Sequence, residues 1–312
     1  PGVCDKPKFL EPIPNVNITA GRSVSLPCLV DHVGDNQVLW MHIDRQMLLS
    51  IDNNSVTLIP RFRVSHPDSR TWTLHIENVT PDDTGYYVCQ VNMVPMINQV
   101  GFLQVVVSPE FLDSESSPSH VAMQEGGDVT LRCRAEGVPS PTITWKREDG
   151  LPFTIAARSS QGVSTYSNGI GMKENTIQSE ELELRSVTRK DMGAYLCIAS
   201  NRVPPSISKR IVLDVHFMPV ITVPNQLFGA PAGSSITLEC EVSAFPPAVQ
   251  FWSFNGQMLI NSSRHETQEL RSEYTITMRL HLRYVSKADY GIYMCEAKNS
   301  LGQTESNLRL YG

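Results

Sequence analysis

Three segments of the chain share one pattern of residues: DDTGYYVC at 82–89, KDMGAYLC at 190–197 and ADYGIYMC at 288–295. Each contains an aspartate, a glycine, a tyrosine and a cysteine at the same spacing. An earlier cysteine precedes each segment, and a tryptophan follows that cysteine by 12 residues in all three cases. An internal repeat of this kind indicates three similar units, each built around its own pair of cysteines.

The repeated cluster is the signature of an immunoglobulin sandwich. In that fold a disulfide joins strands B and F, the tryptophan of strand C packs on it, and the tyrosine forms the corner at the start of strand F. The sequence therefore predicts an all-β protein of three tandem immunoglobulin-like β-sandwiches, the first of V/I type and the second and third of I type. The predicted disulfides, each contributing roughly 4 kcal/mol in the chain-entropy picture, are Cys28–Cys89, Cys133–Cys197 and Cys240–Cys295.

The predicted domains span residues 5–108, 109–216 and 217–312. The first two end after valine-rich strands, each with a proline just beyond, so the links are short and predict a semi-rigid rod. Residues 154–178 are polar and predict a long loop in the second domain. Cys4 has no counterpart, and it is either a free thiol near the terminus or half of an intermolecular bridge.

Composition excludes several classes of protein. The net charge is −6 without a basic run, which argues against nucleic acid as a partner. The cysteines imply an oxidising compartment, and no segment reads as a membrane span or a signal peptide. We therefore expect the extracellular part of a cell-surface protein, with its signal and its anchor, a GPI group or a transmembrane segment, outside this chain.

No catalytic constellation is present in the sequence. GxSxG, HExxH, Walker and GxGxxG motifs are missing, and the SxxK match at 206–209 falls on a predicted strand rather than at the start of a helix. We expect no enzyme activity, no cofactor and no metal site. Two histidines, His42 and His75, are expected to face the core of the first domain.

Four N-glycosylation sequons fit an exported protein, and we expect glycans on Asn17, Asn53, Asn78 and Asn261. Asn53 falls in the turn between strands C′ and C″ of the first domain. A glycan there would either point away from the neighbouring sheet face or limit which partner could dock on it.

The stretch LWMHIDRQMLLSID at 39–52 is apolar on both faces of a strand pattern. Because Trp40 must point into the core, Leu39, Met41 and Ile43 must point out of the sheet. We expect strands C′, F and G and the F–G turn to extend this outer apolar surface, with partner contacts at Met47, Leu49, Ile51, Val88, Gln90, Asn92, Met93, Met96 and Phe102. Further polar groups for a partner are expected at Gln46 and Gln99.

The other two domains serve as a control. The outward positions beside Trp145 are Thr144 and Lys146, and those beside Trp252 are Phe251 and Ser253. The second domain is therefore polar at this place and the third is mixed. A contiguous apolar patch on a monomer usually marks a partner site, so the contrast predicts the principal binding surface on the first domain.

Several segments resemble one family of neuronal recognition proteins. WMHIDRQMLLSI at 40–51, RTWTLHIENV at 70–79, YYVCQVNMVPMINQVGFLQVVV at 86–107 and NQLFGAPAGSSITLEC at 225–240 are similar to Dpr-interacting proteins (DIPs), relatives of the vertebrate IgLONs. The resemblance implies a three-domain ectodomain, often lipid-anchored, whose first domain pairs pseudo-symmetrically through its C, C′, C″, F and G strands with another first domain. The partner it implies is a second copy, as a homodimer, or another neuronal immunoglobulin protein of Dpr type, as a heterodimer.

We therefore predict a glycosylated protein of cell adhesion and neuronal cell–cell recognition, including synaptic specificity, that acts through its first domain. The alternative is a receptor-type ectodomain that binds a secreted ligand with the same face. Because homophilic and heterophilic members occur in the family, the sequence leaves both open.

Overall fold

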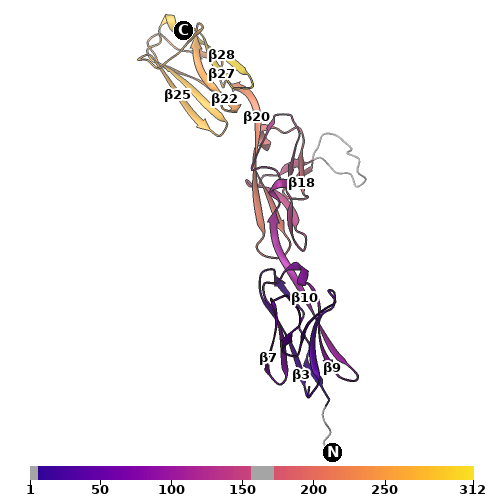
Figure 1. Cartoon of the computed structure of the whole chain (residues 1–312). Helices are drawn as coiled ribbons and strands as arrows, with labels where there is room; N and C mark the ends of the chain where they lie inside the picture. The colour runs from indigo at the N-terminus through magenta and orange to yellow at the C-terminus, as the bar shows by residue number, and fades with distance from the viewer. Residues whose placement is uncertain (1–5, 156–171) are drawn as a thin grey trace, which may run out of the picture.

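The computed structural model describes residues 6–155 and 172–312, which form three β-sandwiches arranged end to end in an elongated rod (Figure 1). The predicted all-β fold of three tandem immunoglobulin-like domains is confirmed. Helical structure in the described part of the chain is limited to the 3₁₀ turns η1 (Pro81–Asp83), η2 (Asp113–Glu115), η3 (Arg189–Asp191) and η4 (Lys287–Asp289). Cys4 and residues 156–171 of the predicted loop lie outside the described residues.

The first domain has two sheets. One has the order β1-β3-β8-β7, formed by β1 (Lys8–Glu11), β3 (Val24–Asp31), β8 (Thr71–Ile76) and β7 (Phe62–Asp68). The other has the order β10-β9-β4-β5-β6, with β2 paired to β10, and its strands are β2 (Val16–Thr19), β10 (Ile97–Phe111), β9 (Gly85–Asn92), β4 (Gln37–His42), β5 (Met47–Ile51) and β6 (Asn54–Ser55).

The strands of the second domain are β11 (His120–Gln124), β12 (Val129–Arg132), β13 (Ala135–Val138), β14 (Thr142–Arg147), β15 (Phe153–Ile155), β16 (Met172–Glu174), β17 (Ile177–Gln178), β18 (Glu181–Leu184), β19 (Gly193–Ser200) and β20 (Ile207–Thr222). The prediction of a loop at 154–178 is wrong at both ends of this segment, which form strands: β15 pairs with β16, and β17 pairs with β14.

The third domain contains β21 (Leu227–Gly229), β22 (Ile236–Phe245), β23 (Val249–Phe254), β24 (Gln257–Met258), β25 (His265–Ser272), β26 (Thr275–Leu282), β27 (Gly291–Lys298) and β28 (Gln303–Tyr311). One sheet joins β22, β26 and β25, and the other has the order β21-β28-β27-β23-β24.

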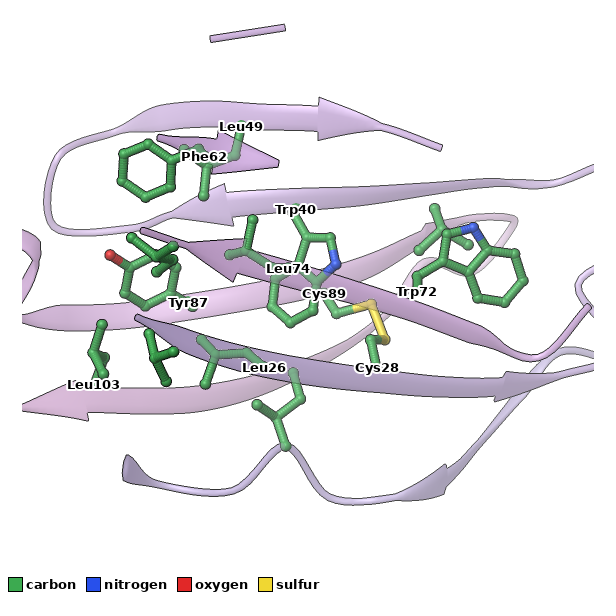
Figure 2. Packing of buried hydrophobic residues seen from close by; sticks show 14 of the residues in the cluster. Leu26, Cys28, Trp40, Leu49, Phe62, Trp72, Leu74, Tyr87, Cys89 and Leu103 are labelled. Carbon is green, nitrogen blue, oxygen red and sulfur yellow. A yellow bond between two sulfur atoms is a disulfide. The ribbon is translucent and has the colours of Figure 1, made fainter. Parts of the chain in front are cut away.

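The core of each domain lies between its two sheets. In the first domain the Cys28–Cys89 disulfide joins β3 to β9, and Trp40 on β4 packs beside it (Figure 2). Alternate residues of β3, β4 and β8 are buried, as expected when successive side chains of a strand point to opposite faces. The other two domains form the same cluster around the disulfides Cys133–Cys197 and Cys240–Cys295.

The repeated aspartate, glycine and tyrosine have structural roles. In each domain the tyrosine hydroxyl donates to the main-chain oxygen of the aspartate four residues earlier, at 2.8, 2.8 and 2.9 Å. The aspartate side chain accepts from the backbone N–H three residues before it, at 2.9, 2.8 and 2.7 Å, which closes the turn. Gly85 has φ +151°, and a Cβ there would lie 2.6 Å from Cε1 of His42, so this position requires glycine.

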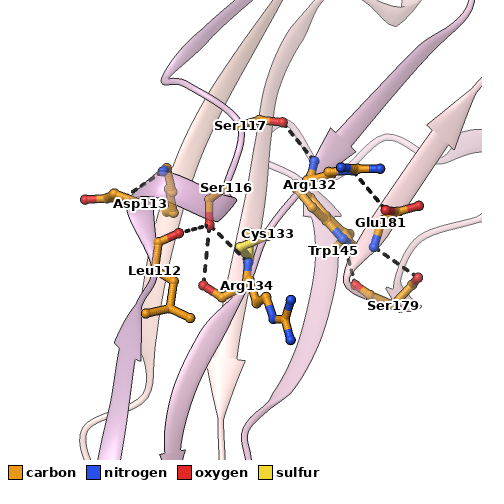
Figure 3. Close-up of a disulfide and its surroundings, with 12 residues drawn as sticks. Leu112, Asp113, Ser116, Ser117, Arg132, Cys133, Arg134, Trp145, Ser179 and Glu181 are labelled. Carbon is orange, nitrogen blue, oxygen red and sulfur yellow. Dashed lines mark hydrogen bonds and ion pairs between the residues drawn. A yellow bond between two sulfur atoms is a disulfide. The ribbon is translucent and has the colours of Figure 1, made fainter.

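The segment between β10 and β11 is tied to the strands of the second domain (Figure 3). The Ser116 hydroxyl accepts from the backbone N–H of Arg134 at 3.0 Å, and the Ser117 hydroxyl accepts from that of Arg132 at 2.8 Å. The indole N–H of Trp145 donates to a main-chain oxygen at 2.9 Å. These bonds satisfy backbone groups that the short strands leave unpaired.

A single strand passes through each junction between domains. β10 pairs with β9 of the first domain and with β13 of the second, and β20 pairs with β19 and then with β22. Asn201 Nδ2 donates to the main-chain oxygens of Val107 at 2.8 Å and Pro139 at 2.7 Å. Asn299 makes the same kind of bond to Phe217, at 2.9 Å. The boundaries expected after residues 108 and 216 fall inside these strands, and as limits of folding units they stay predictions.

Candidate partner-binding face

Strand β4 has the predicted alternation. Its inward residues have no exposed surface: Val38, Trp40 and His42. Its outward positions Leu39 and Met41 are half-buried, and Ile43 beyond its end is 47 % exposed. The apolar surplus of the stretch at 39–52 therefore lies on the outer face of the sheet, as the position of the tryptophan predicts.

The prediction for strand β5 is wrong at two positions. Leu49 is 1 % exposed and belongs to the core, and Met47 packs against the same core. The cause is a β-bulge in the pairing with β4, because an extra residue reverses which side chains point outward. The bulge pairs Leu48 with Met41 and Ile51 with Leu39, so Leu48 takes the outward place expected for Leu49.

Strands β9 and β10 complete the face. Val88 points outward between Met41 and Val100, its partners on the two neighbouring strands, and these leave it 5 % exposed. It therefore forms the floor of the face, and its contact with a partner stays a prediction. Tyr86 and Phe102 are also paired, and their ring centroids lie 4.8 Å apart.

The β9–β10 turn contributes less than predicted. Met93 and Ile97 pack partly against the core. Met96 is 62 % exposed, and Gln90 Nε2 lies 3.3 Å from its sulfur, so this side chain extends over the outer face. Asn92 is exposed at the end of β9.

The structure changes or refines the predictions for three polar residues of the first domain. Gln99 pairs with Cys89 and points inward, so it is not available to a partner. His42 is in the core as predicted, but neither ring nitrogen has a hydrogen-bond partner in the described chain. Burial lowers the pKa of His42, although the charge of Asp44 opposes the shift. His75 points outward from the other sheet, and its ring nitrogens bond two serine hydroxyls at 2.8 and 2.7 Å.

We define the docking face as the outward side chains of β4, β5, β9 and β10 with the residues that continue them: Leu39, Met41, Ile43, Leu48, Ile51, Tyr86, Val88, Gln90, Asn92, Met96, Asn98, Val100 and Phe102. Sequence reasoning missed four of these: Leu48, Tyr86, Asn98 and Val100. Alternation could have identified three of them, because Tyr86 precedes the outward Val88 by two positions, and Asn98 and Val100 precede Phe102 by four and two.

A charged cluster supports one end of the face. Asp44 accepts a bond from the backbone N–H of Tyr86 at 2.7 Å. Asp83 is fully buried and pairs with Arg61. Burial alone would raise the pKa of Asp83, but the bonds from Arg61 and Thr80 hold this pKa below its usual value. The carboxylate therefore remains ionised and fixes the turn that begins β9.

The corresponding surfaces of the other domains differ. In the second domain Thr144 is half-buried and Lys146 exposed. In the third domain Phe251 is half-buried, and Ser253 is 3 % exposed with its hydroxyl bonded to Glu296 at 2.5 Å. The contrast expected from the sequence therefore holds for the second domain and is weaker for the third.

The expected glycosylation sites are all exposed: Asn17, Asn53, Asn78 and Asn261. Their modification stays a prediction. Within 6–155 and 172–312, no group of three or more histidine, cysteine or acidic side chains is placed to hold a metal ion. In the same ranges, no helix has the length and apolar character to cross a membrane.

Comparison with known proteins agrees with this architecture. The model of the immunoglobulin domain matches residues 6–92, 109–201 and 218–299. Lachesin of Drosophila melanogaster is 30 % identical over 297 residues, which cover 93 % of this chain and 77 % of that protein. IgLON family member 5 of Mus musculus is 31 % identical over 308 residues, covering 97 % of this chain and 81 % of the relative.

A solved structure is similar over the whole chain. It is one chain of the crystal structure of Dpr2 Ig1-Ig2 in complex with DIP-Theta Ig1-Ig3, with 40 % identity, a TM-score of 0.79, and coverage of 98 % of this chain and 99 % of that one. The fold and the repeated motif define an immunoglobulin-domain surface protein. The chain belongs to the DIP/IgLON family of neuronal cell-surface immunoglobulin proteins. Members of this family are adhesion proteins and not enzymes.

Proposed function

We propose that this chain is a cell-surface adhesion and recognition protein that pairs through the docking face of its first domain. The partner is a second immunoglobulin-superfamily surface protein, of Dpr type, or a second copy of the chain. In the similar solved structure, Dpr2 Ig1-Ig2 is in complex with DIP-Theta Ig1-Ig3. The anchor, a GPI group or a membrane span, would lie outside these residues.

One observation carries the proposal: four adjacent strands of the first domain present apolar side chains on one outward surface. Across β4 and β5, Leu39 lies opposite Ile51 and Met41 lies opposite Leu48. Val100 and Phe102 extend the surface on β10. Gln90 and Asn92 supply hydrogen-bonding groups among them. An apolar centre with polar groups is the composition of protein interfaces, and a standard interface covers about 800 Å² per partner.

The test is a charge placed at the centre of this surface. Met41→Asp and Ile43→Asp should each weaken partner binding by about 100-fold or more, because an unpaired carboxylate would be buried in the contact. Lys146→Asp is the matched control, since Lys146 follows Trp145 as Met41 follows Trp40.

Binding would be measured with the whole chain. Sedimentation velocity reports self-association, and surface plasmon resonance against a panel of immunoglobulin-superfamily ectodomains reports heterophilic pairing. Unchanged binding by both first-domain variants, with a normal circular dichroism spectrum, would show that another surface binds. Capture of a secreted ligand alone would favour a receptor.

A further inference from the structure

We propose that a polar hollow at the end of the first domain opposite the second domain holds the first sugars of a glycan attached to Asn53. The hollow has a volume of about 620 Å³ and lies between the β3–β4 loop, the β5–β6 turn and the β7–β8 hairpin. This volume is within the range of roughly 300–1,000 Å³ that small-ligand pockets occupy. Asn53 itself lines the hollow, and it begins the sequon Asn53-Asn54-Ser55.

The hollow lies at the end of the first domain that points away from the second. Asp31, the last residue of β3, lines the hollow and pairs with Lys8 near the start of the chain. The N-terminus lies at that end of the rod (Figure 1). The site is thus next to the docking face but not part of it.

The walls of the hollow are held by internal bonds. Asp31 accepts from the guanidinium of Arg70 at 3.1 Å, and Asp52 accepts from the backbone N–H of Val38 at 2.9 Å. Asn36 donates to the main-chain oxygen of Val33 at 2.8 Å. Groups fixed in this way would lose little conformational freedom when a ligand binds.

The lining has the chemistry that a sugar needs. His66 stacks on Trp72, with ring centroids 4.2 Å apart and 21° between the ring planes, and it offers an aromatic surface to the apolar face of a pyranose ring. The side chains of Asp35 and Gln37 are exposed and line the hollow, so they can bond sugar hydroxyls or an acetamido group.

The position of Asn53 favours the glycan attached to it as the ligand of the hollow. Asn53 follows Asp52, whose φ of +49° turns the chain at the end of β5, and it stands on the rim of the hollow. A sugar linked there reaches the hollow without the entropic cost of association between separate molecules. The glycan would then be directed toward the tip and leave the strands of the docking face open. This last consequence rests on the proposed function, whereas the binding of the glycan in the hollow does not.

The test compares variants of the whole chain secreted from eukaryotic cells. Asn53→Gln and Ser55→Ala both remove the sequon, but Ser55→Ala keeps the asparagine side chain. Asn17→Gln is the control, because Asn17 lies on β2 away from the hollow. Glycopeptide mass spectrometry gives occupancy, and hydrogen exchange of residues 31–37 and 66–72 reports whether the walls are covered.

We expect occupied Asn53 in the wild type, and exchange at least about threefold faster in both wall segments of Asn53→Gln and Ser55→Ala, with Asn17→Gln unchanged. His66→Ala should keep the glycan and still exchange faster at 31–37. An unmodified Asn53, or equal exchange in all variants with Asn53 occupied, would overturn the proposal. Partner binding by the same proteins is measured separately, so loss of the docking hypothesis would leave this result intact.

Discussion

Two neighbouring leucines on β5 provide a direct test of the bulge that defines the docking face. Leu49 is 1 % exposed and packs in the core, whereas Leu48 points outward opposite Met41. Leu49→Ala removes buried methyl groups and leaves a cavity, at a cost of about 3 kcal/mol within the usual 2–5. Leu48→Ala loses contacts on a half-open surface and should cost about 1 kcal/mol or less.

The two costs in unfolding free energy should give clearly different melting temperatures and rates of hydrogen exchange. For a domain of about 100 residues, about 3 kcal/mol lowers the melting temperature by roughly 15 °C, and about 1 kcal/mol lowers it by roughly 5 °C. Because the chain has three domains, a melting curve of the whole chain combines their transitions. Hydrogen exchange of β3 and β8 instead reports the stability of the first domain alone. Exchange through global opening would be about 100-fold faster in Leu49→Ala than in the wild type, and only about fivefold faster in Leu48→Ala.

The binding data must show the opposite order. Leu48→Asp should weaken partner binding and leave β3 and β8 protected, because this carboxylate is solvated until a partner covers it. Equal destabilisation by Leu48→Ala and Leu49→Ala would mean that β5 pairs with β4 in a different register. A stable Leu49→Asp protein would mean the same. Either result would change which residues of β5 belong to the docking face.

Two further predictions concern buried charge. His42 has an ordinary pKa of 6.5 when unfolded and a lower pKa in the core, so its contribution to stability is present above pH 6.5 and lost as pH falls below it. The free energy of unfolding of the first domain should therefore fall between pH 6.5 and 5 more steeply in the wild type than in His42→Gln, by at most about 1.4 kcal/mol per pH unit. Thermal denaturation at each pH measures this fall, and parallel curves for the two proteins would contradict it. Arg61→Ala should cost about 3 kcal/mol, because it removes the main cationic partner of the buried Asp83 carboxylate and leaves it only Arg45, at 3.6 Å, and the bonds from Thr80. Arg63→Ala, which removes an exposed ion pair, should change the unfolding free energy by less than about 0.5 kcal/mol, and chemical denaturation that gave equal costs would refute the comparison.

Much of the first domain follows from its sequence because two kinds of residue anchor the pattern. The disulfide and Trp40 must be internal, and strict alternation then assigns every position of β4 and most of β9. The same reasoning fails on β5. Leu48 and Leu49 are equally apolar, so no local pattern distinguishes them, and the bulge depends on how β5 pairs with β4. Gln99 fails for a related reason, since a glutamine on a strand is expected to be solvated and this one faces the disulfide strand.

The junctions between domains account for a difference that the repeat alone does not explain. Four residues after the last cysteine of the second and third domains stand Asn201 and Asn299, and each binds the strand arriving from the domain before it. The first domain carries Met93 at that position, packed partly into its own core. Its turn therefore lacks the asparagine that binds an incoming strand in the other two domains. Because β10 and β20 cross the junctions without a break, we expect the rod to hold the docking face of the first domain at a fixed distance from the third domain.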